Sequence, residues 1–279
     1  MTVLSAFEPS PGDGHRLASF ALAKNRVDVW KIDVARTHGG VEPYRRVLSP
    51  DEVERADRFR FERHQRTFTL ARAAMRQILG GYLRLPPQRL AFRYGAEGKP
   101  ELGGDLGNSG IRFNLSHSGE VVLLAVTQGL TVGVDVEFVD SRFASQAVAE
   151  QFFSKSEVHL LQALPQVDRL DAFFACWTRK EAYVKALGGG LWIPLDSFDV
   201  AFGPGIKAAL LESRVQPSEV LRWSMYDIET WERYRAALVV EGKEHQLRAL
   251  EWEIDMPVSQ GETVASASQM ASSDSWAIR

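Results

Sequence analysis

The stretch Val-Gly-Val-Asp-Val-Glu at residues 132–137 alternates strictly, which is typical of a β-strand, and Trp-Thr-Arg-Lys-Glu-Ala-Tyr-Val-Lys at 177–185 is typical of a helix. Alternation puts the carboxylates of Asp135 and Glu137 on one face of the strand. The helix offers Glu181 and, one turn later, Lys185. Hard cations prefer oxygen ligands, so these groups suit Mg²⁺ holding a phosphate. The two stretches predict a magnesium-phosphate site.

Two simpler interpretations of these acids compete with the metal site. Alternating acids also occur on surface strands for solubility, but here the valines form an apolar face and Gly133 shares the face of the acids. We expect this glycine to clear space for a ligand. Glu181 could equally be an exposed helical acid paired with Lys185.

The composition sets limits on the class of protein. The chain has 279 residues, a formal charge of −3 and a single cysteine. It can bury a large core, but an intrachain disulfide is impossible, and Cys176 in an apolar helical run is expected to pack inside. The charge of −3 predicts no nucleic-acid partner. Residues 41–76 hold nine arginines against six acids, which predicts at most a local anion-attracting surface. Neither a signal peptide nor a membrane span is predicted, so we expect a cytoplasmic protein without a membrane partner.

Periodicity and capping signals predict a series of helices and strands. Ser49 should cap a helix with Pro50 at its first position and Glu52 completing a capping box, and Ser154 should cap another. Longer helices are predicted over 66–83, stopped by Gly80-Gly81, and over 171–187, ended by 188–190. Strands are predicted over 26–34, 90–94, 111–115, 121–127, 196–202, 220–227, 234–240 and 248–254, with a glycine-rich loop over 95–110.

A weak internal repeat links the two capped helix pairs. Ser-Pro-Asp-Glu-Val-Glu at 49–54 matches Ser-Lys-Ser-Glu-Val-His at 154–159, and the following helices end in Leu-Gly-Gly. Aligning those ends puts Ala73 opposite Glu181, so the first half would lack the helical carboxylate. One site in the crevice between two halves is then expected. Chance similarity between capped amphipathic helices is the alternative.

Two polar segments could contribute to a phosphate site. Asn-Leu-Ser-His-Ser-Gly at 114–119 is predicted to be a turn, in which His117 and backbone N–H groups could donate to phosphate. A Ser116–His117 hydrolase is disfavoured because no nucleophile elbow surrounds the serine. Lys99, in a loop shaped by Gly98 and Pro100, could act as a phosphate point charge.

Five motifs in order resemble the 4'-phosphopantetheinyl transferases, over about residues 45–240, in the form of the monomeric surfactin-synthetase-activating (Sfp) type. They are Gly-Lys-Pro (98–100), Phe-Asn-Leu-Ser-His-Ser (113–118), Val-Gly-Val-Asp-Val-Glu (132–137), Phe-Phe-Ser-Lys-Ser-Glu (152–157) and the stretch at 177–185. The resemblance implies an α+β (mixed α/β) fold of two similar halves related by a pseudo-two-fold axis, each with helices packed on a small sheet. It also implies a monomer with coenzyme A between the halves. We therefore divide the chain into a leading segment (1–20), an N-terminal half (21–130), a C-terminal half with the metal site (131–255) and a tail expected to be disordered (256–279).

The resemblance also implies roles for individual residues. The metal ligands would be Asp135, Glu137 and Glu181, holding Mg²⁺ or, alternatively, Mn²⁺. Contacts to coenzyme A would come from Arg55, Thr67, Lys99, Pro100, Asn114, Ser116, His117 and Lys185. Arg55 matches a basic residue for the 3'-phosphate, although Glu52 stands where some relatives have a second one.

The implied reaction transfers 4'-phosphopantetheine from coenzyme A to a serine of an acyl or peptidyl carrier protein in polyketide, nonribosomal-peptide or fatty-acid synthesis. Such an enzyme is a holo-[acyl-carrier-protein] synthase, and adenosine 3',5'-bisphosphate leaves. Glu181 is the candidate base and Lys185 the catalytic cation. The alternatives are a magnesium-dependent coenzyme A or nucleotide pyrophosphatase and a non-catalytic carrier-binding protein.

Carrier docking is implied for an apolar surface near the crevice. Phe143, Phe152 and Phe153 lie between the metal strand and the next helix and could provide this surface. For Phe152 and Phe153 a place in the core is the favoured interpretation.

Overall fold

The computed structural model describes residues 3–4, 20, 22–37, 39–95, 98–188 and 193–252. The helices are α2 (Glu42–Arg45), α3 (Pro50–Asp57), α4 (Glu62–Leu83), α5 (Gln146–Phe152), α6 (Lys155–Ala163), α7 (Gln166–Leu187) and α8 (Glu219–Arg222). The strands are β1 (Val3–Leu4), β2 (Arg26–Asp33), β3 (Phe92–Tyr94), β4 (Pro100–Leu102), β5 (Ile111–Ser118), β6 (Val121–Gln128), β7 (Val132–Phe138), β8 (Phe198–Val200), β9 (Leu210–Ser213), β10 (Trp223–Ile228), β11 (Tyr234–Glu241) and β12 (Gln246–Trp252).

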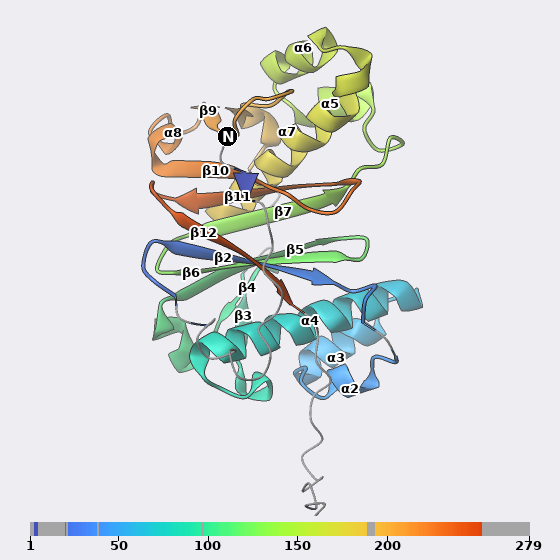
Figure 1. Cartoon of the computed structure of the whole chain (residues 1–279), viewed down its shortest axis with the longest axis vertical. Coiled ribbons are helices and arrows are strands. Elements are labelled where there is room, and N and C mark those ends of the chain that lie inside the picture. The colour runs from blue at the N-terminus through green and yellow to red at the C-terminus, as the bar shows by residue number, and fades with distance from the viewer. Residues whose placement is uncertain are drawn as a thin grey trace, which may run out of the picture.

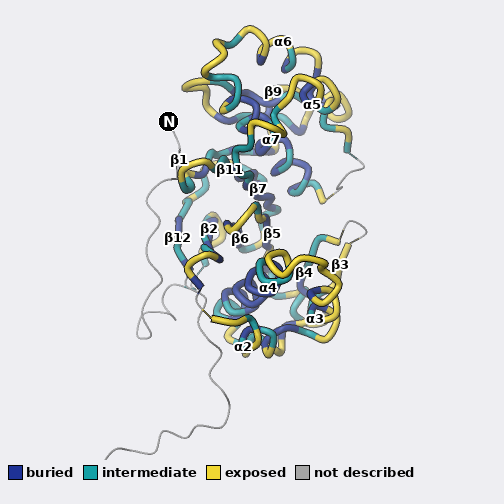
Figure 2. Tube along the Cα trace, turned by 90° about the vertical axis from the view of Figure 1, so that its right-hand side faces the viewer, coloured by how far each residue is buried: buried dark blue, intermediate teal, exposed yellow. Residues whose placement is uncertain are grey.

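The elements stack in four layers, helix on sheet on sheet on helix (Figure 1). One long helix, α4, packs on the sheet β12-β2-β6-β5, and the other, α7, packs on the sheet β1-β10-β11-β7. Three apolar clusters fill the layers, one under each long helix and one between the sheets. The clusters appear as the buried spine of the trace (Figure 2). Both faces of each sheet are therefore covered, which explains the mixed α/β class.

The two halves repeat one topology. In the first, β2 is followed by α3, α4, β5 and β6, and the strands lie in the order β2-β6-β5. In the second, β7 is followed by α6, α7, β10 and β11, and the order is β7-β11-β10. The predicted similarity of the halves is thus visible in the strand order. The last strand, β12, returns to pair in parallel with β2, and β1 pairs in parallel with β10.

Each half also has the same buried ion pair beneath its capped helix. Capping boxes begin α3 at Ser49 and α6 at Ser154, as predicted. The glutamate of the first box, Glu52, meets Arg76 of α4 at 2.6 Å, and Glu157 of the second meets Lys180 of α7 at 2.7 Å. All four side chains are buried. The pairs fix each short helix against its long partner.

The helix ends differ from the sequence expectation. Both long helices contain 22 residues, so matching their ends puts Gln77, rather than Ala73, opposite Glu181. The predicted end of this helix at residue 83 is confirmed, but Gly80 and Gly81 do not stop it, since α4 continues past them to Leu83 and is capped by Arg84 in the left-handed conformation. The glycines serve packing instead, because side chains there would collide with the carbonyl O of Leu85 and the ring of Phe20.

Several short elements were not predicted. Helices α2, α5 and α8 and strands β4 and β9 occupy segments expected to be loop or strand. Cys176 is fully buried, as expected. None of the helices in the described ranges is long and apolar enough to cross a membrane. The predicted tail over 256–279, and the leading segment apart from residues 3–4 and 20, lie outside the described residues.

Candidate active site

The two sheets meet along β5 and β7, where side chains replace the usual backbone ladder. The Asn114 side chain accepts a hydrogen bond from the Val134 N–H at 2.8 Å. Two residues on, Ser116 Oγ accepts from the Val136 N–H at 3.4 Å, and Ser118 Oγ accepts from the Phe138 N–H at 3.0 Å. We call this junction the seam. It satisfies the edge N–H groups of β7 and places every second residue of β5 beside the candidate metal strand.

The predicted turn over 114–119 is wrong in its extent. Strand β5 continues to Ser118, and only Gly119 and Glu120 connect it to β6. Ser116 and Ser118 therefore act from a strand, and their hydroxyls donate to Asp135 at 3.0 Å and Glu137 at 2.9 Å. The backbone N–H groups of this segment are engaged in pairing with β6 rather than presented by a turn.

Asp135 is the most buried of the three candidate ligands. Its carboxylate is 1% exposed, and the Lys185 ammonium donates to Oδ1 at 2.5 Å. The same ammonium donates to Ser116 Oγ at 2.9 Å. Oδ2 is buried and makes no hydrogen bond. Since a buried carboxylate oxygen without a partner is costly, this atom is suited to a cation.

The other two acids share the electrostatic field of Asp135. Burial and the Asp135 charge raise the pKa of Glu137 to about 7. The same two causes raise the pKa of Glu181, and the Lys185 charge opposes both shifts. A bound divalent cation would relieve this repulsion, so the donor set fits Mg²⁺ chemically. In the described ranges, however, no three His, Cys, Asp or Glu side chains are already arranged as a metal centre.

Gly133 serves the helix rather than a ligand, which corrects the sequence interpretation. A Cβ at this position would overlap the carbonyl O of Ala182 and the backbone of Ala186. The close contact brings α7 onto β7. It thereby sets Glu181 and Lys185 against the acids of the strand.

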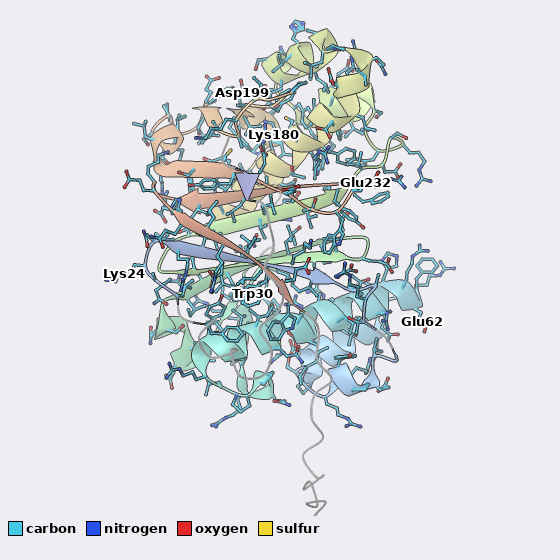
Figure 3. The ribbon with its side chains drawn as sticks, in the orientation of Figure 1. Lys24, Trp30, Glu62, Lys180, Asp199 and Glu232 are labelled. Carbon is cyan, nitrogen blue, oxygen red and sulfur yellow. The ribbon has the colours of Figure 1, made fainter. Side chains whose placement is uncertain are left out.

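Two buried cations next to Glu181 fix the rotation of α7. Arg179 bonds to both oxygens of Asp227 on β10 at 2.8 Å. Lys180 pairs with Glu157 and also donates to the carbonyl O of Leu195 and Phe198. Figure 3 shows Lys180 within the C-terminal half. These bonds anchor the side of the helix opposite the seam, and they leave Glu181 and Lys185 half-exposed toward it.

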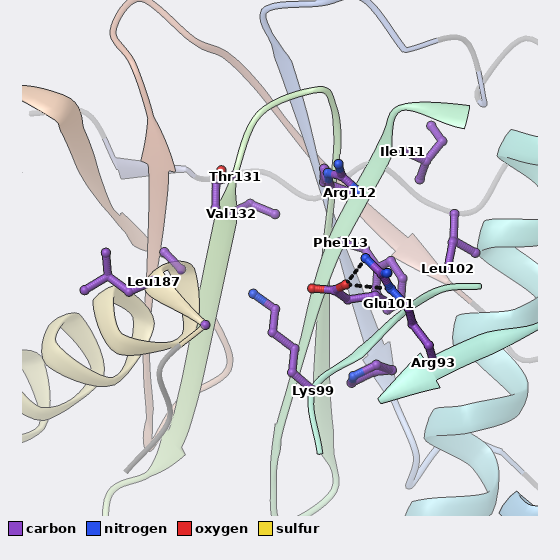
Figure 4. A pocket seen from close by; sticks show the side chains of 13 residues that line it. Arg93, Lys99, Glu101, Leu102, Ile111, Arg112, Phe113, Thr131, Val132 and Leu187 are labelled. Atoms are coloured by element: carbon purple, nitrogen blue, oxygen red, sulfur yellow. Dashed lines mark hydrogen bonds and ion pairs between the residues drawn. The ribbon is translucent and has the colours of Figure 1, made fainter. Parts of the chain in front are cut away.

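Lys99 lies on the carboxyl end of α7, which sequence reasoning did not foresee. Its ammonium donates to the carbonyl O of Lys185 at 2.6 Å. Lys99 and Pro100 line a 290 Å³ cavity beside the end of α7, together with Arg93, Glu101 and apolar side chains (Figure 4). Burial lowers the pKa of Lys99, and the Lys185 charge lowers it further. The contact neutralises a helix carboxyl terminus.

A second cavity, of about 430 Å³, lies at the other end of β5. Thr67 and His117 both line it, together with Arg63, His64 and Arg66. The surrounding protein lowers the pKa of His117 by removing water, and the charges of Lys185 and Arg72 lower it further. Two predicted coenzyme A contacts from different elements thus meet in one cationic cavity.

Two arginines flank that cavity in different ways. The Arg55 guanidinium lies 5.4 Å from the ring centre of Phe68. Arg72, which no sequence motif singled out, is buried and lies over the rings of Phe68 and Tyr94. Among the described residues, the Arg72 guanidinium donates one hydrogen bond, to the sulfur of Met75, and burial lowers the pKa of Arg72. A buried guanidinium without a carboxylate partner favours a bound anion. In the sequence, the one signal that could have pointed to Arg72 was its position in the arginine-rich stretch over 41–76.

The remaining predicted residues separate into core and surface. Glu52 is buried against Arg76, so the acid does not occupy a phosphate position. Phe153 is buried, Phe152 packs on the core, and Phe143 is 42% exposed. Phe143 packs its ring edge-on against Trp177. The core interpretation of Phe152 and Phe153 is confirmed.

Comparison with known proteins gives consistent matches in both halves. A family model described as the 4'-phosphopantetheinyl transferase superfamily matches residues 131–239, and one described as 4'-phosphopantetheinyl transferase, N-terminal, matches residues 36–129. The chain is 35% identical over 224 residues to 4'-phosphopantetheinyl transferase HetI of Nostoc sp., covering 80% of this chain and 91% of that protein.

The chain is also similar, over part of its length, to more distant relatives. It is 31% identical to 4'-phosphopantetheinyl transferase Sfp of Bacillus subtilis, covering 57% of this chain and 68% of that protein. It is 26% identical to the human L-aminoadipate-semialdehyde dehydrogenase-phosphopantetheinyl transferase, covering 72% and 70%. The crystal structure of Thermotoga maritima holo-[acyl-carrier-protein] synthase aligns with a TM-score of 0.32 at 25% identity, over 41% of this chain and 64% of that one.

Proposed function

The chain belongs to the 4'-phosphopantetheinyl transferase superfamily, and on that premise we propose that it transfers 4'-phosphopantetheine from coenzyme A to a serine of an acyl or peptidyl carrier protein. The products are a holo carrier and adenosine 3',5'-bisphosphate. We assign it to the Sfp type, acting as a monomer, because one chain supplies both halves and the seam between them.

The observation that carries the proposal is the state of Asp135. This buried carboxylate has one oxygen bonded to Lys185 and Ser116 and the other without a partner, beside two acids with raised pKa values. We propose that Asp135, Glu137 and Glu181 hold Mg²⁺, or Mn²⁺ in its place. The cation supplies charge neutralisation for a pyrophosphate.

Coenzyme A then spans the seam. We propose that its nucleotide end enters the cavity of Thr67 and His117, where Arg55 and the buried Arg72 attract phosphate. Ser116 and Asn114 hold the seam beside the pyrophosphate, and Lys99 with Pro100 supports the end of α7 from the other side. The cluster of cations around an otherwise acidic site supports an anionic co-substrate.

Side chains of α7 carry the chemistry. The carrier serine oxygen forms a bond to the phosphorus that bears pantetheine, and the bond from that phosphorus to the bridging oxygen breaks. Glu181, with its raised pKa, accepts the serine proton. The Lys185 ammonium stabilises charge on the phosphoryl oxygens. Adenosine 3',5'-bisphosphate leaves with the electron pair.

Mass spectrometry of the carrier tests the proposal. The protein is incubated with coenzyme A, Mg²⁺ and several unrelated apo carrier domains. We expect the carrier to gain the mass of phosphopantetheine, and no gain on any carrier would refute transfer. Release of nucleotide without carrier would support a pyrophosphatase instead, and binding without either product would support a non-catalytic carrier-binding protein.

A further inference from the structure

An exposed aromatic surface precedes and begins α4. Residues 57–64 are all exposed, and two of them are phenylalanines, Phe59 at 37% and Phe61 at 52%. Phe59 stacks on His64, and Phe61 also contacts that ring. Large apolar side chains clustered at the surface commonly mark an interaction site. We call Phe59, Arg60, Phe61, Arg63 and His64 the aromatic-arginine edge.

The aromatic-arginine edge carries positive charge that the described residues do not neutralise. The guanidinium carbons of Arg60 and Arg63 lie 5.6 and 5.1 Å from the ring centre of Phe61. Neither arginine forms an ion pair with a carboxylate in the described residues, whereas the neighbouring Arg58 pairs with Glu54. The one exposed acid between these two arginines in the sequence is Glu62. The surface is suited to an acidic partner with an apolar side chain.

The aromatic-arginine edge forms one wall of the opening to the proposed nucleotide cavity. Phe59, Arg63 and His64 line that cavity with His117 and Ser118. The Ser118 hydroxyl donates to Glu137, so one lining residue of the cavity contacts a candidate metal ligand directly. Figure 3 shows Glu62, in the first turn of α4, at the outer end of that helix. In Figure 1, α4 begins at the side of the molecule toward which β7 runs.

A small ligand in the cavity does not account for the whole edge. Arg60 and Phe61 are not among the residues that line the cavity, and Phe61 is the more exposed of the two rings. A nucleotide could touch Phe59 and Arg63, but contact with Arg60 and Phe61 requires a partner that extends over the outer surface. The proposed carrier is such a partner, since it must bring a serine to this opening.

We propose that the aromatic-arginine edge is a docking surface for the carrier domain. An acidic helix of the carrier lies against Arg60 and Arg63, and an apolar side chain of that helix packs on Phe61. The proposal rests on the proposed transferase function and adds to it the N-terminal half as a carrier-binding surface.

The test separates the carrier from coenzyme A. In the full-length protein, Phe61→Ser with Arg60→Glu should raise KM for an apo carrier about tenfold. The same variant should leave kcat and KM for coenzyme A within about twofold, because neither residue lines the cavity. Added salt should raise the wild-type KM for the carrier and have less effect on the variant.

A control variant carries the same two kinds of substitution outside the aromatic-arginine edge. Leu221→Ser with Arg89→Glu removes one exposed apolar side chain and reverses one exposed charge on distant elements. This control should keep the wild-type KM for the carrier. Circular dichroism and thermal melting of both variants establish that the fold is retained, and Arg60→Gln alone gives a milder second variant.

Each outcome bears on a different claim. If the wild type modifies no carrier, the transferase function fails. If the wild type is active and the edge variants keep the wild-type KM for the carrier, the docking surface is refuted while the function stands. A rise in KM for coenzyme A alone would assign the edge to the nucleotide and also refute carrier docking.

Discussion

Asp28 in the N-terminal half and Asp135 in the C-terminal half occupy corresponding strands, β2 and β7, and have opposite surroundings. Both carboxylates are almost fully buried. Asp28 bonds to Arg248 through both oxygens, at 2.9 and 2.6 Å, and accepts from the Tyr82 hydroxyl at 2.5 Å. Asp135 has partners on Oδ1 only. In the N-terminal half both oxygens of the buried acid are used in structural bonds, whereas in the C-terminal half Oδ2 has no hydrogen bond.

The difference extends to the long helices. At the position of Glu181, α4 has Gln77, which accepts a hydrogen bond from the Trp252 ring. The buried pairs Glu52–Arg76 and Glu157–Lys180, in contrast, are alike in both halves. The buried ion pairs are therefore repeated in both halves, whereas the residues that face the seam differ. Substitutions at matched positions should separate structural residues from residues of the proposed site.

The largest difference is expected between Asp135→Ala and Asp28→Ala. If Asp135 binds the proposed cation, its loss should lower transfer by about a thousandfold with the fold retained, because the most buried of the three proposed ligands is removed. Loss of Asp28 should cost about 3 kcal/mol of unfolding free energy, because Arg248 loses its partner. Carrier mass spectrometry and urea unfolding measure the two effects. Wild-type transfer by Asp135→Ala would refute the metal assignment.

A second comparison concerns substitutions that remove one partner of each repeated ion pair. Glu52→Gln and Glu157→Gln should each lower the unfolding free energy by about 3 kcal/mol, since each leaves a buried cation unpaired. Glu54→Gln is the control, because its partner Arg58 is exposed and the expected loss is below about 0.5 kcal/mol. Urea denaturation gives all three values. A neutral result for only one buried pair would contradict their equivalence.

A third comparison concerns close packing by glycine. Gly133→Ala should cost about 1–3 kcal/mol and slow transfer, because the methyl group meets the backbone of α7. Gly81→Ala meets the ring of Phe20, a side chain that can move, so the loss should be smaller. Thermal melting together with an activity assay shows which variant loses more stability. A larger stability loss in Gly81→Ala than in Gly133→Ala would contradict the interpretation that Gly133 is the position with the less tolerant packing.

The smallest effect is expected at the end of α7. Lys99→Met removes the bond to the Lys185 carbonyl and should cost about 0.5 kcal/mol. Thermal melting at low salt measures it, and Lys99→Arg should recover most of the loss. If stability is unchanged while KM for coenzyme A rises, Lys99 acts on the phosphate directly, as the sequence first suggested.

Local signals predicted the elements better than they predicted contacts. Strands β2 and β7 and the capping boxes at Ser49 and Ser154 follow from alternation and end signals within a few residues. The role of Gly133 and the bond from Lys99 to α7 could not be predicted, since each depends on an element distant in sequence. A turn was predicted at Ser116, but this residue lies in a strand, because its hydroxyl bonds to β7 across the seam rather than to nearby backbone.

The return of β12 to the first sheet has a consequence for synthesis of the chain. Asp28 and Arg248 are 220 positions apart, and the Trp30 and Trp252 rings pack at 5.6 Å. The first sheet is thus completed by a strand that follows β2 by more than 200 residues. Contacts over such separations form late, so this sheet lacks an edge strand until elongation has passed Trp252. The second sheet needs no residue beyond Glu241, so its strands are all synthesised before the first sheet can be completed.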